Sequence, residues 1–217
     1  MTPTTKTDRE HSLQADEFLW DTSQDTEVHS YVGPILNRWL KKSEGKSLLD
    51  LGCGNGALTS KIEKLGLKCV GTDFSSSGIS IAKKAHPLVD FFQSTMDAPL
   101  PDEHHGKYDI VMAVEVIEHL LLPRQLFARA KEALKPGGTM IVTTPYHGYL
   151  KNIMLAFVNK YDSHWHPLRD YGHIKFFSIA TLGQIFTEEG FEVDEIVRVG
   201  RLPPLARSMM FKAILSK

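Results

Sequence analysis

Cysteine is scarce in this sequence, and only Cys53 and Cys69 occur among its 217 residues. Two cysteines at this spacing support neither a disulfide framework nor a zinc finger. No charged stretch followed by an apolar stretch precedes residue 20, so the pattern of a secretion signal is missing as well. These absences together indicate a cytoplasmic protein.

Long apolar runs and an excess of one charge are also missing. The densest apolar stretch covers residues 152–158, well short of the about 18 residues that a membrane span needs. The 25 Lys and Arg residues face 26 Asp and Glu residues, and a net charge of -1 provides no field that would attract an extended nucleic acid. We therefore expect a soluble protein with at most weak peripheral membrane contact and no nucleic-acid partner.

The composition that remains is that of a globular protein, with 42% apolar and 24% charged residues. The length predicts one domain over residues 1–217. A polar, Thr-rich beginning predicts a mobile tail over residues 1–12. Apolar residues at helical spacing predict an N-terminal helical cap within residues 13–45, so the core should cover residues 46–217.

Strand and helix patterns alternate along this core. The expected strands cover 47–51, 68–72, 89–93, 108–114, 139–143, 191–199 and 209–215, and the expected helices cover 30–40, 57–65, 76–85, 123–134 and 179–189. Such alternation is typical of an α/β fold with a doubly wound, Rossmann-like sheet. The sequence therefore predicts seven strands that run mostly parallel.

A glycine-rich turn, Gly52-x-Gly54-x-Gly56, follows the first expected strand and opens a helix. Glycines at such a turn let backbone amides approach a ligand, although a tight connection without a ligand is an alternative. The pattern fits a nicotinamide dinucleotide as well as an adenosyl cofactor, and Asp73 stands where a ribose-binding acid is expected in both. Asp50 favours S-adenosylmethionine, because a carboxylate there would repel a pyrophosphate and attract a sulfonium and an ammonium.

The stretches 49–56, 108–111 and 134–138, together with Asp73, resemble the class I S-adenosylmethionine-dependent methyltransferases in order and spacing. The resemblance covers about residues 47–200 and implies an antiparallel last strand. It also implies a set of cofactor contacts: Asp50, Gly52 and Gly54 at the methionine part, Asp73 at the ribose, Phe74, Thr95, Met96 and Asp97 at the adenine, and Val114 after the fourth strand.

The segment Glu115-Val-Ile-Glu118-His119 follows the fourth strand, at an edge where ligands bind in such sheets. A helical turn would put Glu115, Glu118 and His119 on one face, where they could bind a divalent cation such as magnesium. The segment resembles the Glu-x-x-Glu-His of two groups, the ubiquinone-biosynthetic O-methyltransferases and the small-RNA 3′-terminal 2′-O-methyltransferases that use magnesium. In the RNA group a later histidine completes the site, and His173 stands in the comparable place.

Methyl transfer to oxygen requires positioning of the acceptor and removal of its proton. His119 and His173 are the candidate catalytic residues, either as metal ligands or as a general base. Alternatively, Glu118 and His119 only occupy a helix N-terminal region and His173 bonds a carbonyl. His164 and His166 are further candidates in the following loop.

Residues 145–172 form an insertion longer than the usual connection between a strand and a helix, and we expect it to cover the substrate. Leu150, Ile153, Met154 and Phe157 recur at helical spacing, so this apolar face would meet the core, an apolar acceptor or a lipid surface. The ubiquinone group acts on polyprenyl substrates at the membrane. Its N-terminal pattern includes a cofactor-contacting Arg, and residues 20–29 of this chain contain none.

The sequence thus predicts an S-adenosylmethionine-dependent methyltransferase that methylates the oxygen of a small quinone- or phenol-like hydroxyl compound. The alternatives are metal-dependent 2′-O-methylation of an RNA end, a non-catalytic domain that binds S-adenosylmethionine, and a nicotinamide-dependent reductase.

Overall fold

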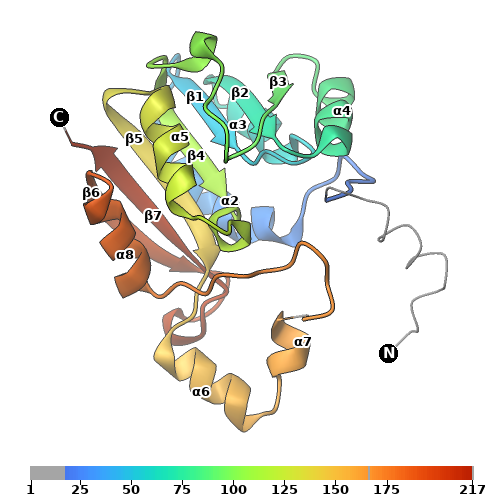
Figure 1. Ribbon diagram of the computed structural model, residues 1–217, viewed down its shortest axis with the longest axis vertical. Helices are drawn as coiled ribbons and strands as arrows, with labels where there is room; N and C mark the ends of the chain where they lie inside the picture. The colour runs from blue at the N-terminus through green and yellow to red at the C-terminus, as the bar shows by residue number, and fades with distance from the viewer. Residues whose placement is uncertain (1–17, 166, 217) are drawn as a thin grey trace.

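The computed structural model describes residues 18–165 and 167–216, so the expected tail over residues 1–12 lies outside the described residues. Its centre is a seven-stranded sheet in the order β3-β2-β1-β4-β5-β7-β6 (Figure 1). The strands are β1 Ser47–Leu51, β2 Lys68–Asp73, β3 Asp90–Gln93, β4 Tyr108–Val114, β5 Leu134–Pro145, β6 Phe191–Val199 and β7 Ser208–Leu215. Neighbours from β3 to β5 pair in parallel, and β7 pairs antiparallel with both β5 and β6. The predicted fold class, including the reversed last strand, is confirmed.

Helices cover both faces of this sheet (Figure 1). The helices are α2 Glu27–Leu40, α3 Ala57–Glu63, α4 Ser76–Ala85, α5 Arg124–Ala133, α6 Tyr149–Phe157, α7 Tyr161–Trp165 and α8 Ile179–Glu188, with short 3-10 turns at η1 Asp102–His104, η2 Ile117–His119 and η3 Pro203–Leu205. Helix α2 begins three residues before the predicted start at residue 30, because the apolar spacing that predicts it sets in only after its first turn.

Alternation of side chains along the strands builds two apolar layers. Leu49 and Val111 point to the layer that contains α5 and α8. Leu48 and Ile110, their neighbours in sequence, point to the layer that contains α2, α3 and α4. Each central strand is therefore buried on both faces, as the continuous apolar runs in the sequence predict.

The order of the strands reverses between β1 and β4, which lie side by side in parallel. In a doubly wound sheet the connections from two such strands leave to opposite faces, and the space at their carboxyl ends is the usual ligand site. The glycine turn follows β1, and the segment from Glu115 to His119 follows β4. The fold thus brings the two chemical motifs of the sequence to one edge.

Residues 18–26, here called the N-terminal strap, run across this edge before α2 begins. The Ser75 hydroxyl donates to the carbonyl of Phe18, and the backbone N–H of Trp20 donates to the Ser77 hydroxyl. The Asn55 side chain donates to the carbonyls of Thr22 and Gln24. The strap is therefore hydrogen-bonded both to the glycine turn and to the beginning of α4.

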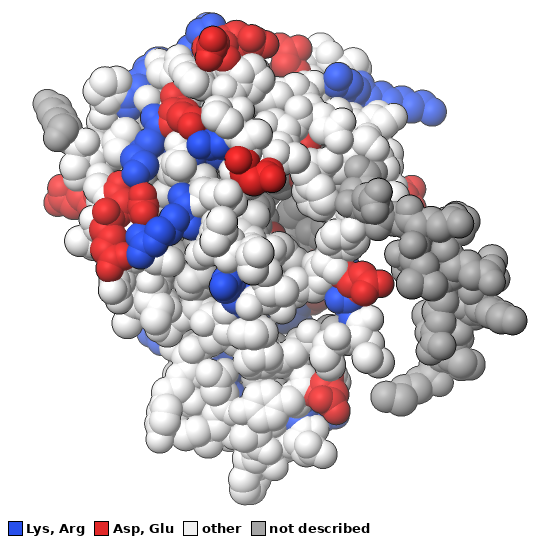
Figure 2. Space-filling model, viewed as in Figure 1, with Lys and Arg blue, Asp and Glu red and all other residues white. Residues whose placement is uncertain are grey.

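The insertion after β5 forms α6 and α7, which lie together beyond the end of the sheet (Figure 1). The predicted amphipathic helix is confirmed, and of the three alternatives for its apolar face the exposure of that face contradicts packing against the core. Leu150 is 55% exposed and Phe157 is 85% exposed, and Ile153 and Met154 are exposed as well. Figure 2 shows few charged side chains over α6, whereas charges of both signs gather over α5 and α8. Within residues 18–165 and 167–216, no helix combines the length and apolar character of a membrane span.

Candidate active site

The glycine turn adopts a backbone that only glycine accepts easily. Gly52, Gly54 and Gly56 all have positive φ angles, of 83°, 53° and 74°. A Cβ atom at position 52 would stand 2.5 Å from the Val116 side chain, and one at position 54 would stand 2.3 Å from the indole of Trp20. The turn therefore touches both the strap and the segment after β4.

Asp73, at the end of β2, stabilises this turn through hydrogen bonds. One carboxylate oxygen accepts from the backbone N–H of Gly54 at 2.8 Å, and the other accepts from the N–H of Ser75 at 2.8 Å. These two bonds fix the Asp73 carboxylate beside the glycine turn. The position agrees with the ribose contact that the sequence predicts.

Asp50 lies buried at the end of β1, and the Thr59 hydroxyl donates to its carboxylate at 2.6 Å. Burial, together with the nearby charge of Asp73, raises the pKa of Asp50 to about 7. Two carboxylates close to one turn favour a positively charged ligand there.

The residues predicted around the adenine follow the carboxyl ends of neighbouring strands. Phe74 is exposed directly after Asp73, and its ring lies 6.4 Å from that of Tyr171. Thr95, Met96 and Asp97 follow β3, and Val114 ends β4. A hydrogen bond from Thr95 holds the pKa of Asp97 below its usual value. The structure thus collects these predicted contacts at the edge that carries the glycine turn.

Three of the four predicted metal ligands come together. One ligand atom each of Glu118, His119 and His173 lies within 4.8 Å of the others, and the rings of the two histidines are 4.8 Å apart. The chain achieves this through the backbone, because the N–H groups of Ile174 and Lys175 both donate to the carbonyl of Glu118. This pairing holds His173 beside the segment after β4.

The environment of Glu118 suits a cation. The side chain is completely buried, and one oxygen accepts from the Thr144 hydroxyl at 3.0 Å. The other oxygen has no hydrogen-bond partner among the described residues and stands 4.0 Å from Nε2 of His173. Burial, with the neighbouring Glu115, raises the pKa of this carboxyl well above its usual value. An orphaned buried oxygen that faces two imidazoles is a donor set that fits a divalent ion.

Glu115, the fourth predicted ligand, does not join this cluster. Its φ angle is 54°, so residues 115–119 do not form the expected helical turn. The left-handed backbone directs the side chain elsewhere, and its carboxylate accepts from the hydroxyls of Thr143 and Ser208 at 2.9 and 3.3 Å. The prediction that Glu115 shares a face with Glu118 and His119 is wrong for this reason.

Glu115 instead lines a cavity of about 500 Å³ between α2, β5, α6, α7 and the beginning of β7. His164, a further candidate from the sequence, lines it too, whereas His166 lies outside the described residues. His147 and Lys151 also line this cavity, although no sequence pattern points to either of them. The exposed apolar residues of α6 that were expected to cover an acceptor are not among the lining residues.

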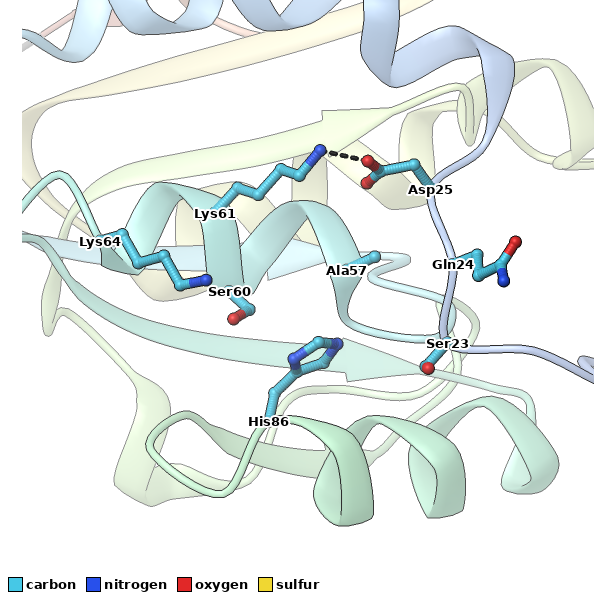
Figure 3. Close-up of a pocket in the computed structure, with 8 residues that line it drawn as sticks. All are labelled: Ser23, Gln24, Asp25, Ala57, Ser60, Lys61, Lys64 and His86. Atoms are coloured by element: carbon cyan, nitrogen blue, oxygen red, sulfur yellow. Dashed lines mark hydrogen bonds and ion pairs between the residues drawn. The ribbon is translucent and has the colours of Figure 1, made fainter.

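A second cavity, of about 460 Å³, lies between the N-terminal strap, α3 and the end of α4 (Figure 3). Lys61 and Asp25 point toward one another across it and form an ion pair. His86 at the end of α4 points toward Ser60 of α3. None of the residues predicted to bind cofactor or metal lines this second cavity.

A reversed last strand, a glycine turn at the strand-order reversal and an acid at the end of β2 define a class I S-adenosylmethionine-dependent methyltransferase. A family model described as "Methyltransferase domain" matches residues 25–196, and the chain belongs to this family.

Curated relatives of this chain include enzymes named ubiquinone biosynthesis O-methyltransferase. The chain is 23% identical over 191 residues to the ubiquinone biosynthesis O-methyltransferase of Aromatoleum aromaticum, covering 85% of this chain and 81% of the relative. It is 33% identical over 164 residues to the enzyme of that name from Azorhizobium caulinodans, covering 73% and 64%.

Solved structures agree on the fold. An S-adenosylmethionine-dependent methyltransferase from Mesorhizobium loti has a TM-score of 0.67 at 17% identity, covering 83% of this chain and 96% of the other. The magnesium protoporphyrin IX methyltransferase from Synechocystis PCC 6803 has a TM-score of 0.66 at 16% identity, covering 97% and 94%.

Proposed function

We propose that this methyltransferase transfers its methyl group to a hydroxyl oxygen of a small quinone- or phenol-like compound. The observation that carries the proposal is the cluster of Glu118, His119 and His173 beside the glycine turn. The names of the curated relatives support oxygen as the acceptor atom. A hydroxyl is a weak nucleophile until its proton is removed, and this cluster offers the groups that would favour the removal.

The cofactor would lie along the carboxyl ends of β1, β2 and β4. In this proposal Asp50, Gly52 and Gly54 face the methionine part, and Asp73 accepts from the ribose hydroxyls. Phe74, Thr95, Met96 and Asp97 surround the adenine, and Val114 contacts the cofactor after β4. Holding donor and acceptor in line supplies a large part of the rate enhancement in such transfers.

Glu118, His119 and His173 are the residues that would hold a divalent cation such as magnesium. The His119 Nδ1–H donates to the carbonyls of Tyr171 and Gly172, which leaves Nε2 as the ligand atom. Thr144 orients the Glu118 carboxylate. When bound, the ion would lower the pKa of the acceptor hydroxyl. Without an ion, His119 or His173 would accept the proton as a general base.

The distribution of charge supports a small molecule over an RNA end. Figure 2 shows Lys and Arg interspersed with Asp and Glu on the face in view, and several are paired across α5 and α8. RNA binding relies on many exposed, unpaired cations clustered on one face, and the described residues on the face in view form no such cluster.

The test is a methyl-transfer assay with S-adenosylmethionine, magnesium and a panel of catechols and hydroquinones. We expect formation of S-adenosylhomocysteine together with a methyl ether, identified by mass spectrometry and NMR. Methylation at carbon or nitrogen would contradict the proposal. Cofactor binding without turnover on any hydroxyl compound would support the non-catalytic alternative.

A further inference from the structure

Lys151 is the unexpected feature of the cavity that Glu115 lines. The side chain is only 7% exposed, and its ammonium donates to the carbonyls of Tyr146 at 2.8 Å and Arg207 at 3.4 Å. Among the described residues, no carboxylate forms an ion pair with it. Burial lowers the pKa of Lys151 to about 8. The charge of Glu115 raises this pKa from a distance, but no carboxylate of a described residue contacts the ammonium. A buried ammonium without a contacting anion costs free energy, which a bound anion would offset.

His147 presents a second unmatched group to the same cavity. The ring is 9% exposed, and its buried nitrogens form no well-aligned hydrogen bond among the described residues. The side chain of Asn152 is near enough to raise the pKa of the ring. The imidazole packs against the rings of Trp165 and Phe176, with centroids 5.2 and 5.1 Å away, and these two rings lie 3.9 Å from one another. Burial and the charge of Lys151 outweigh Asn152 and lower the pKa of His147 to about 4, so the imidazole is neutral and has one N–H to donate.

The charges around the cavity do not balance. Its titratable lining residues are Glu27, Tyr31, Glu115, His147, Lys151, His164, His173, Arg201 and Arg207. Arg207 is paired with Glu27. Glu115 is already hydrogen-bonded to two hydroxyls, and burial raises its pKa to about 7. Within the part of the chain that the structure describes, Lys151 and the exposed Arg201 therefore form no ion pair, and Glu115 acts on Lys151 only from a distance.

We propose that this cavity holds the methyl acceptor and that the acceptor carries a carboxylate, bound by Lys151 and His147. The inference rests on the proposed function for the role of acceptor. One buried ammonium and one imidazole N–H match the single charge and the two oxygens of a carboxylate better than the double charge of a phosphate. His173 borders both the cavity and the cluster with Glu118, so one small molecule in the cavity lies beside the reacting edge.

The experiment compares 3,4-dihydroxybenzoate with its neutral isostere 3,4-dihydroxybenzamide. Calorimetry on the full chain saturated with S-adenosylhomocysteine measures both affinities. We expect the acid to bind at least about tenfold more tightly, the scale of a charged hydrogen bond. Lys151→Met should abolish this preference, whereas Lys151→Arg should retain most of it. Lys160→Met, at an exposed lysine just after α6, is the matched control and should bind like the wild type.

Three results would overturn the inference: equal affinities for acid and amide, no binding of the acid, or an acid preference that persists in Lys151→Met. If Lys151→Met does not fold, the acid-to-amide ratio of the wild type and of Lys151→Arg decides. The proposed function fails separately. A preference for the carboxylate without methyl transfer would contradict the proposed activity and support the carboxylate site. Methylation of neutral catechols without any preference for the acid would support the activity and contradict the site.

Discussion

The indole of Trp20 lies so close to Gly54 that a Cβ atom at position 54 would stand 2.3 Å from its Cζ2 carbon. The same indole stands 2.9 Å from the place of a Cβ at Gly78, at the beginning of α4. A residue of the N-terminal strap therefore packs on the glycine turn and on α4 together. This contact makes the strap part of the wall around the proposed cofactor site.

Gly54→Ala should weaken S-adenosylhomocysteine at least about tenfold in calorimetry. The new methyl group collides with Trp20, and the positive φ of 53° strains any L residue. Gly33→Ala is the control, because nothing lies within 4 Å of its Cβ position in α2. There we expect unchanged affinity and a gain in stability of up to about 1 kcal/mol from helix propensity. Normal binding in Gly54→Ala would show that the turn is only structural.

Asp73→Ala should weaken S-adenosylhomocysteine by about 1.5 to 3 kcal/mol, the scale of hydrogen bonds to a charged group. The melting temperature should also fall, because the N–H groups of Gly54 and Ser75 lose their acceptor. Ser75→Ala separates the two effects, since it removes the cap of α4 and leaves the carboxylate. Unchanged affinity in Asp73→Ala would refute its proposed contact with the ribose.

Asp50→Asn should change how stability depends on pH. The folded pKa of Asp50, about 7, lies above its ordinary value of 3.8, so the folded state holds this proton more tightly than the unfolded chain. The stabilisation is present below about pH 4 and is lost as pH rises to about 7, an effect on the order of a few kcal/mol. The Asn variant should therefore lose less stability over this range in denaturant titrations.

The same variant reports on the ligand charge. If the Asp50 carboxylate attracts the sulfonium, Asp50→Asn should weaken S-adenosylmethionine more than S-adenosylhomocysteine, which lacks that charge. Equal losses for both ligands would count against this role.

Dialysis against EDTA should abolish methyl transfer and leave the affinity for S-adenosylhomocysteine nearly unchanged. The proposed cation ligands Glu118, His119 and His173 are separate from Asp73 and the glycine turn. Glu118→Gln is the genetic counterpart, because it keeps the shape and removes the charge. Full turnover after chelation would show that the reaction needs no ion, and His119 or His173 would then be the candidate general base.

A double substitution of Ile153 and Phe157 by Ser on α6 should leave the melting temperature within about 1 °C of the wild type, because both side chains are already exposed. We expect weak co-sedimentation of the wild type with phospholipid vesicles and less of the variant. A large loss of stability would show that this face is buried in solution, for example against a second copy of the chain.

Most of the fold could be predicted because its signals are local. The glycine turn and the apolar strands each determine the conformation of their own segment. The boundary before β5 is predicted less well, because Pro136-Gly137-Gly138 predicts a connection and the strand begins at Leu134. The cluster of Glu118, His119 and His173 could be predicted in part, since strand order and motif spacing placed its members at one edge.

The rest depends on contacts that no local pattern reveals. Lys151 reads in the sequence as the charged flank of an apolar stretch, and only the docking of α6 against the beginning of β7 turns its ammonium inward. Glu115 adopts a left-handed backbone that non-glycine residues rarely take, so the helical turn was the natural expectation. Trp20 lies in a segment without periodicity, and its place on Gly54 follows from the long-range bonds of the strap.

The left-handed backbone at Glu115 gives two acids of one short segment different neighbours. The Glu115 carboxylate lines the cavity and accepts from the Ser208 hydroxyl, whereas the Glu118 carboxylate, three positions later, lies beside His119 and His173. In the proposed arrangement, substitutions on the α6 side of the cavity can alter which molecule is accepted while Glu118, His119 and His173 stay as they are. Lys151 and His147 line the cavity without belonging to the cluster, so these two positions are the place to redirect the enzyme toward other acceptors.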